Sequence, residues 1–179
     1  ARLGEKELHA YIKFISSRPE YAKRTIIGTG KATAWQVMEF LDTLDYEVFK
    51  GVHFLSKDTK QSDRRFESEI CWLADQLKTN LWLYNNIQRG KELSENVIEK
   101  VSRHPNVSGV KYGARNHMPF IKATKFESDS FQVLSAGHFY FSALSWGCQA
   151  STTSDACLIP QAYQKLSALF KQGKMEDAR

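Results

Sequence analysis

Residues 80–112 read NLWLYNNIQRGKELSENVIEKVSRHPNVSGVKY, and this stretch decides the fold. The apolar run 80–84 predicts a strand, the serine-capped stretch 94–103 predicts an amphipathic helix, and 107–112 predicts a second strand. Such a strand–helix–strand unit is typical of a parallel sheet, because a parallel connection needs a long crossover that is usually helical. We therefore expect the two strands to lie in one parallel sheet with the helix covering a face of it.

The same unit repeats along the whole chain. Further strands are predicted to start near residues 25, 51, 131 and 149, and each predicted strand is followed by a helix. The predicted helices cover residues 3–17, 32–44, 62–77, 94–103, a segment from Pro119, 139–146 and 160–171. This alternation fits an open doubly wound sheet and part of an eight-stranded barrel equally well, so periodicity leaves both architectures open.

Apolar residues at helical spacing predict which side of each helix is buried. In the helix 62–77 the inward residues are expected to be Phe66, Ile70, Leu73 and Leu77. In the helix 94–103 they are Val97, Ile98 and Val101. In the helix 32–44 they are Trp35, Met38, Leu41 and Leu44.

Composition and charge are those of a folded globular chain. Of the 179 residues, 42% are hydrophobic and 25% are charged, which excludes a disordered or collagen-like chain. The odd number of cysteines, without a CxxC pair, argues against a disulfide framework or a zinc site and favours the cytoplasm. Residues 130–154 are uncharged, but Gln132, His138 and Gln149 favour buried strands and a helix over a membrane span.

Neither end of the chain has the features of a natural terminus. Ala1 is not an initiator methionine, no signal peptide opens the chain, and the chain stops within a helical pattern after Met175. We therefore expect one domain, residues 1–179, that is truncated at both ends.

Common ligand-binding motifs are incomplete. The strand that ends in Gly28-Thr29-Gly30 has Thr33 where a dinucleotide fingerprint needs glycine, so a tight turn is the simpler interpretation. The five histidines form no metal-binding pattern, and the basic residues form no nucleic-acid module, so neither a metal nor a nucleic acid is expected. Lys111 and Tyr84 are the candidates that remain, because each ends a parallel strand, where α/β proteins build active sites.

These residues carry a family resemblance. Leu83-Tyr84-Asn85, followed 27 residues after the tyrosine by a lysine in Asn106-Val107-Ser108-Gly109-Val110-Lys111, resembles the dihydrodipicolinate synthase / N-acetylneuraminate lyase family. The glycines of Gly28-Thr29-Gly30, Ser135-Ala136-Gly137 and Gly173-Lys174 also stand where the family has them. The resemblance implies a TIM (β/α)8 barrel, of which this chain would supply strands three to eight, and a homo-oligomer, either a dimer or a tetramer.

The resemblance also implies a chemistry. Family members form a Schiff base between a lysine and a 2-oxo acid such as pyruvate, and then make or break a C–C bond to a second carbonyl compound, without a cofactor. Lys111 matches that lysine, and Tyr84 matches the tyrosine that transfers protons beside it. Thr152 matches a small residue facing pyruvate, and Arg89 matches an arginine that binds substrate. The apolar interior of a barrel would favour the neutral amine that the reaction needs.

The sequence departs from the family pattern at several places. The family's fourth strand commonly runs into a Pro-Tyr-Tyr segment, where Phe54-Leu55-Ser56-Lys57 stands here. The aromatic residue that synthases use in their proton relay has no counterpart. The loop after Tyr84 is one residue shorter than usual. The alternative is therefore a family member that has lost catalysis and binds a 2-oxo acid or serves only in assembly.

Overall fold

The structure, a computed structural model, describes residues 3–113 and 117–178, so the outermost residues of the predicted domain lie outside it. Within the described residues one sheet of six parallel strands has the order β1-β2-β3-β4-β5-β6. The strands are β1 (Ile26–Gly28), β2 (Gly51–Phe54), β3 (Asn80–Asn85), β4 (Val107–Tyr112), β5 (Gln132–Ala136) and β6 (Ala150–Thr152). The predicted parallel sheet is confirmed.

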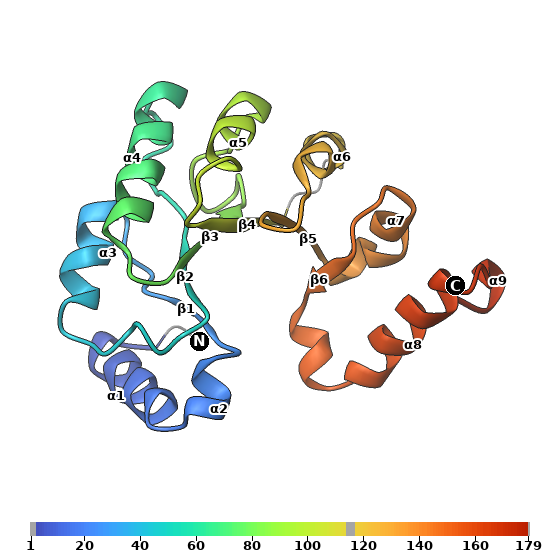
Figure 1. Cartoon of the computed structure of the whole chain (residues 1–179), viewed down its shortest axis with the longest axis horizontal. Coiled ribbons are helices and arrows are strands. Elements are labelled where there is room, and N and C mark those ends of the chain that lie inside the picture. The colour runs from blue at the N-terminus through green and yellow to red at the C-terminus, as the bar shows by residue number, and fades with distance from the viewer. Residues whose placement is uncertain (1–2, 114–116, 179) are drawn as a thin grey trace.

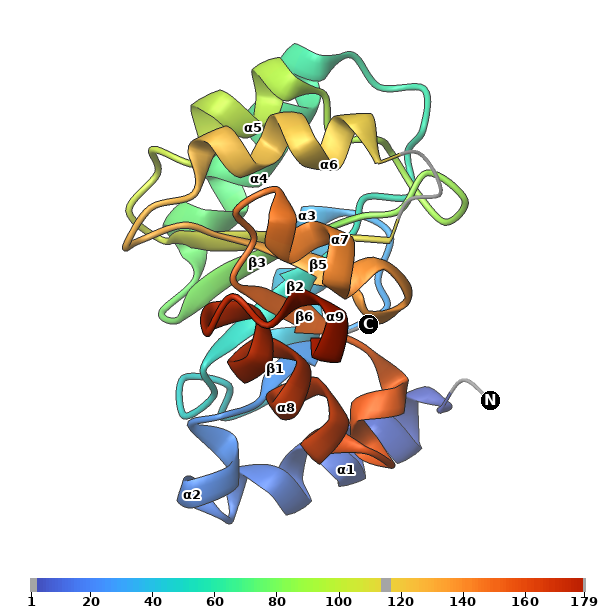
Figure 2. The same ribbon diagram turned by 90° about the vertical axis from the view of Figure 1, so that its right-hand side faces the viewer.

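Helices cover the outside of this sheet (Figure 1). They are α1 (Glu5–Ser16), α2 (Pro19–Ala22), α3 (Ala34–Leu41), α4 (Asp63–Gln76), α5 (Glu95–Val101), α6 (Met118–Ala123), α7 (Tyr140–Ser145), α8 (Pro160–Lys171) and α9 (Met175–Ala178), with short 3-10 helices η1 (Thr124–Phe126), η2 (Gly137–Phe139) and η3 (Ser154–Cys157). Helices α4, α5 and α6 lie together on one flank, and α1 and α2 lie at the opposite end (Figure 2).

The strand order decides between the two architectures that periodicity left open. In a doubly wound sheet the strand order reverses at a switch point, whereas in a (β/α)8 barrel each strand lies beside the next one along the chain. Here the order follows the sequence throughout the described residues, with β1 and β6 at the two edges. The curled sheet is therefore part of a (β/α) barrel, as the resemblance implied.

The two faces of the sheet carry different residues. Phe54, Leu83, Val110 and Val133 are neighbours in register and form part of the buried core under the helices. Because side chains alternate along a strand, the residues between them point to the inner, concave face. Polar groups at the carboxyl ends of the strands on that inner face are thus brought together.

Two of the three predicted helix faces are confirmed, and the third is confirmed in part. Phe66, Ile70 and Leu73 of α4 are buried, as are Val97, Ile98 and Val101 of α5. In α3 the buried residues are Ala34, Val37, Phe40 and Leu41, so the prediction for Leu41 is confirmed, and Met38 and Leu44 are partly buried against the core. Trp35, however, is 69% exposed, so its predicted inward position is wrong.

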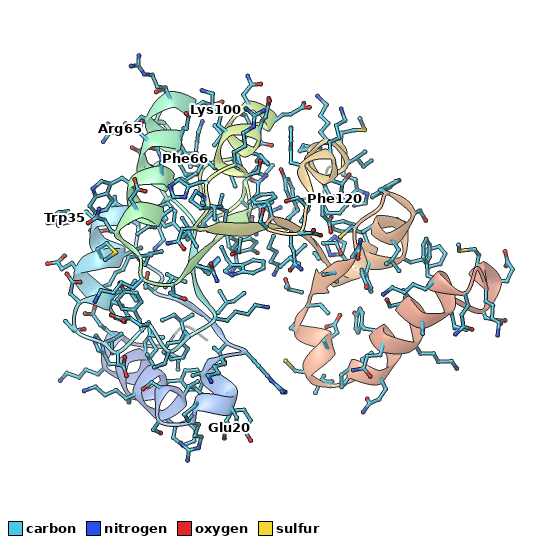
Figure 3. The ribbon with its side chains drawn as sticks, viewed as in Figure 1. Glu20, Trp35, Arg65, Phe66, Lys100 and Phe120 are labelled. Carbon is cyan, nitrogen blue, oxygen red and sulfur yellow. The ribbon has the colours of Figure 1, made fainter. Side chains whose placement is uncertain are left out.

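The error at Trp35 arose because α3 carries two apolar stripes, and periodicity alone does not rank them. The stripe that contains Val37 and Phe40 faces the core, where the Phe40 ring lies against His9 of α1 with ring centroids 4.5 Å apart. Trp35 instead stacks on Trp72 of α4, with ring centroids 6.0 Å apart, and Figure 3 shows Trp35 on the outside of the molecule, whereas Phe66 is buried.

The uncharged stretch 130–154 forms β5, η2, α7 and β6, which agrees with buried strands and a helix. No helix in the described ranges combines the length and the apolar character that a membrane span needs.

Candidate active site

Lys111 and Tyr84 lie side by side at the carboxyl ends of neighbouring strands. They are direct partners in the register of β3 and β4, and the Lys111 Nζ atom lies 4.9 Å from the centroid of the Tyr84 ring. A cation at this distance from an aromatic ring is attracted by its electron-rich face. Both side chains are partly buried. The structure thus brings together the two residues that the sequence singled out separately.

His53 of β2 approaches Tyr84 from the opposite neighbouring strand. Its ring centroid lies 5.3 Å from that of Tyr84. Burial, and to a smaller extent the positive charge of Lys111, lowers the pKa of His53 to about 4. The imidazole is therefore uncharged at neutral pH, and one of its ring nitrogens can accept a hydrogen bond.

The hydroxyl of Tyr84 is held in place by its neighbours. Asn86 Nδ2 donates a hydrogen bond to the hydroxyl oxygen at 3.0 Å. A Cβ atom on Gly113 would lie 3.0 Å from that oxygen, so glycine there leaves room for the phenol. The hydrogen bond from Asn86 uses a lone pair of the hydroxyl oxygen. The hydroxyl proton of Tyr84 therefore stays available for donation.

The Trp82 ring lies beneath Lys111 and Tyr84 on the inner face of the sheet. It lies two residues before Tyr84 on the same face of β3, and it is 6% exposed. A Cβ atom on Gly51 would come within 2.6 Å of the Trp82 ring, and one on Gly109 within 2.9 Å. The two glycines on the flanking strands therefore make the space that the indole fills, and the indole closes the interior beneath Lys111.

Arg89 lies in the loop after β3 and lines a small cavity together with Tyr84 and His53. The cavity has a volume of about 120 Å³. The loop is fixed by a turn in which the Arg89 N–H donates to the Asn86 carbonyl at 2.9 Å. Asn86 thus positions the phenol through its side chain and the arginine through its backbone.

Thr152 occupies the end of β6, two strands away from Lys111. Its register partner on β5 is Ala136. Ala136 lies two residues after Leu134, the register partner of Lys111, so Thr152, Ala136 and Lys111 lie on the same face of the sheet. The Thr152 hydroxyl is buried and has no hydrogen-bond partner among the described residues. The structure therefore places Thr152 on the same face as Lys111 and Tyr84 but joins it to neither by a hydrogen bond.

Sequence reasoning missed His53 and Asn86 as parts of this group. A signal for His53 was present, because it is a polar residue between the apolar residues Val52 and Phe54 of a strand, which marks the opposite face. Asn86 offered no such signal, since its role depends on the loop conformation.

An amine, a phenol and an uncharged imidazole thus share one face at the carboxyl ends of the strands. An amine can add to a carbonyl carbon, and the phenol can donate the proton that such an addition requires. Within the described ranges, no cluster of three histidine, cysteine, aspartate or glutamate side chains is placed to hold a metal ion.

Comparison with solved structures supports the fold. The chain is similar to a dihydrodipicolinate synthase from Bacillus anthracis, with a TM-score of 0.85 and 18% identity over 98% of this chain and 61% of that chain. It is also similar to a prophage protein of the dihydrodipicolinic acid synthase family from E. coli K12, solved in complex with pyruvate (TM-score 0.83, 19% identity, 98% and 61% covered). A third match is the 2-keto-3-deoxygluconate aldolase from Picrophilus torridus (TM-score 0.80, 15% identity, 98% and 65% covered).

The chain thus spans less than two thirds of the length of each of these structures. No curated protein sequence matches it significantly. The model of the dihydrodipicolinate synthetase family, however, matches residues 63–179, a range that includes Tyr84 and Lys111. Since this range is more than half of the chain, the chain belongs to the dihydrodipicolinate synthetase family.

Proposed function

We propose that the protein is a class I aldolase or lyase that forms a Schiff base between Lys111 and pyruvate or a related 2-oxo acid. The observation that carries this proposal is the pairing of Lys111 with Tyr84 at the ends of adjacent strands, with Nζ 4.9 Å from the ring.

In this reaction the Lys111 amine attacks the ketone carbon of the 2-oxo acid and forms a carbinolamine. The carbinolamine loses its hydroxyl group as water after a proton is donated to that oxygen, and an iminium remains. Tyr84 is suited to donate this proton, because the hydrogen bond from Asn86 leaves its own proton free. Loss of a proton from the neighbouring carbon then gives an enamine, which attacks the carbonyl carbon of the second substrate.

Thr152 and Arg89 complete the proposed site. Thr152 faces the 2-oxo acid from β6, and its unpaired hydroxyl is suited to donate to a carboxylate. Arg89 faces the second substrate, because it shares its cavity with Tyr84 on the side of β1 and β2. The protein of this proposal is a cytoplasmic homo-oligomer, either a dimer or a tetramer. Light scattering of the intact protein tests the oligomeric state.

Reduction with borohydride in the presence of pyruvate tests the proposal. The intact protein should gain one reduced pyruvate, and peptide mass spectrometry should map the adduct to Lys111. Lys111→Ala should abolish the adduct, whereas Lys122→Ala should not change it, because Lys122 pairs with Glu95 at 3.1 Å on the surface. Tyr84→Phe should still form the imine slowly, with turnover lower by about 10²–10⁴, as is usual for a positioned acid–base group.

An adduct on Lys31 or Lys122 would contradict the proposal. If folded protein formed no adduct at all, the non-catalytic alternative, a family member that only binds or assembles, would take its place. Circular dichroism of each variant separates a lost reaction from a lost fold.

A further inference from the structure

A groove on the outer surface lies between helices α3 and α4. It has a volume of about 500 Å³, and its walls come from these two helices and from the loops that lead into β2 and β3. Among the residues that line it, Leu41 and Tyr46 are buried, so the base of the groove is largely apolar. None of the described residues in its walls belongs to the candidate active site. The groove is therefore a concave surface separate from the proposed site of reaction.

Two tryptophans form one wall of this groove. Trp35 of α3 and Trp72 of α4 stack with their ring centroids 6.0 Å apart and an angle of 26° between the rings. Trp35 is 69% exposed and Trp72 is 37% exposed, and Figure 3 shows Trp35 on the outside of the helix layer. Together with Met38 they make a contiguous apolar surface, and such a surface marks an interaction site when polar residues surround it.

The polar residues around this surface are mostly acidic. Glu39 of α3, Asp42 directly after α3 and Glu47 in the loop before β2 line the groove, and all three are exposed. Lys78 also lines it, but Lys78 pairs with Glu47 at 2.6 Å. In the described part of the chain neither Glu39 nor Asp42 forms an ion pair. Two carboxylates thus stay unneutralised beside the indoles, on a chain with a net charge of +5.

Indole rings and carboxylates together suit a guanidinium group. A guanidinium is planar and cationic, so it can stack on the electron-rich face of a tryptophan while its N–H groups donate to a carboxylate. An ammonium group forms the same ion pair but has no plane to stack. The chemistry of the groove therefore favours arginine over lysine.

The charge of the groove also bears on which molecule brings the arginine. A second copy of this chain, related by two-fold symmetry, would present the same face. Glu39 and Asp42 of one copy would then lie opposite those of the other, and like charges across an interface cost free energy. A basic segment of a different protein has the complementary charge.

We propose that the groove between α3 and α4 docks an arginine-bearing segment of a partner protein. The guanidinium stacks on the tryptophan pair and donates to Glu39 or Asp42, and an apolar neighbour of the arginine packs beside Met38. A volume of about 500 Å³ lies in the range of about 300–1,000 Å³ that is usual for ligand sites. This inference is independent of the proposed aldolase reaction.

Binding of three matched peptides to the intact protein tests the proposal. The probes are acetyl-Leu-Arg-Leu-amide and two analogues in which lysine or citrulline replaces the arginine. Citrulline keeps the planar shape of arginine without its charge. Calorimetric titration should show the arginine peptide binding about tenfold more tightly than the citrulline peptide, which is the contribution of one charge-assisted hydrogen bond. It should also bind more tightly than the lysine peptide, and its affinity should fall as salt is added.

Variants locate the site. Trp35→Ala should weaken binding of the arginine peptide by about two- to fivefold, the contribution of an exposed cation–π contact. The double variant Glu39→Gln, Asp42→Asn should abolish the preference for arginine over citrulline, and it covers the case in which loss of the Trp35 ring disturbs the helix. Glu20→Gln is the matched control, because Glu20 is an exposed carboxylate on α2 that does not line the groove and lies well apart from Trp35 in Figure 3.

Equal binding of the arginine and citrulline peptides would overturn the proposal, as would unchanged affinity in both folded variants. Light scattering tests the alternative that a second copy covers the groove. If Trp35→Ala lowered the oligomeric state of the intact protein, this face would be an interface between copies of the chain, and the proposed partner would be wrong.

Discussion

Helices α4 and α8 have similar sequence patterns and different surroundings. Both are amphipathic, and they have 14 and 12 residues. Helix α4 packs between α3 and α5 and buries Phe66, Ile70, Leu73 and Ala74. Helix α8 follows the edge strand β6 and contacts α7, η3 and α9, and none of its residues, all of them described, is buried. An apolar stripe therefore predicts a face, but neighbouring elements decide whether that face is buried.

The starts of the two helices differ as well. Ser62 caps α4, because its side chain accepts a hydrogen bond from the Arg65 N–H at 3.3 Å. Helix α8 begins at Pro160 after Ile159, without a side-chain cap. Helix α4 is thus stabilised by a cap at its start and by a buried face. Helix α8 has neither a side-chain cap nor a fully buried face.

Truncation of one phenylalanine in each helix should give the largest contrast. Phe66→Ala should lower the free energy of unfolding by about 3–5 kcal/mol, because it removes a fully buried ring. Phe170→Ala should cost less than about 1 kcal/mol, because the Phe170 ring is only partly buried. Urea unfolding measures both. Equal losses would show that α8 is covered in solution, and the contrast between the helices would then be wrong.

The pH dependence of the free energy of unfolding should come from His53, which lies in the half of the sheet that α4 covers. The pKa of His53 is lowered to about 4 in the folded protein, so the unfolded chain binds a proton first as the pH falls. This contribution to stability is complete above about pH 6.5 and is lost between about pH 6.5 and 4. The loss should amount to about 3 kcal/mol, since one pKa unit corresponds to about 1.4 kcal/mol.

Variants of two histidines assign this effect. His53→Gln should flatten the pH dependence in that window, whereas His138→Gln, at an exposed residue in the C-terminal half, should leave it unchanged. Urea unfolding at a series of pH values is the measurement. An unaltered profile in His53→Gln would place the titrating group elsewhere.

Removal of the cap of α4 should have the smallest effect. Ser62→Ala should destabilise the protein by about 1 kcal/mol, because the Arg65 N–H loses its partner. Ser154→Ala, at an exposed serine in η3, should change stability by less than about 0.5 kcal/mol. Hydrogen exchange should show faster exchange confined to the first turn of α4. Faster exchange spread over the whole helix would contradict a local role for the cap.

Much of the fold could be predicted because its signals are local. Glycine and proline turns, serine caps and the spacing of apolar residues lie within one element, and they identified the strands and the buried faces of α4 and α5. In α3 the burial of Leu41 could be predicted, but the exposure of Trp35 could not, because Trp35 and Val37 belong to two apolar stripes. Only the elements packed against α3 select the stripe that contains Val37.

For the candidate site, the sequence by itself singled out Lys111 and Tyr84, since a polar residue at the end of an apolar parallel strand is visible without a structure. The tertiary structure alone decided their distance, the approach of His53 to Tyr84, and the place of Arg89 in the cavity beside Tyr84. The physical reason is the register of parallel strands, which joins residues far apart in the chain and sets the burial that keeps His53 uncharged.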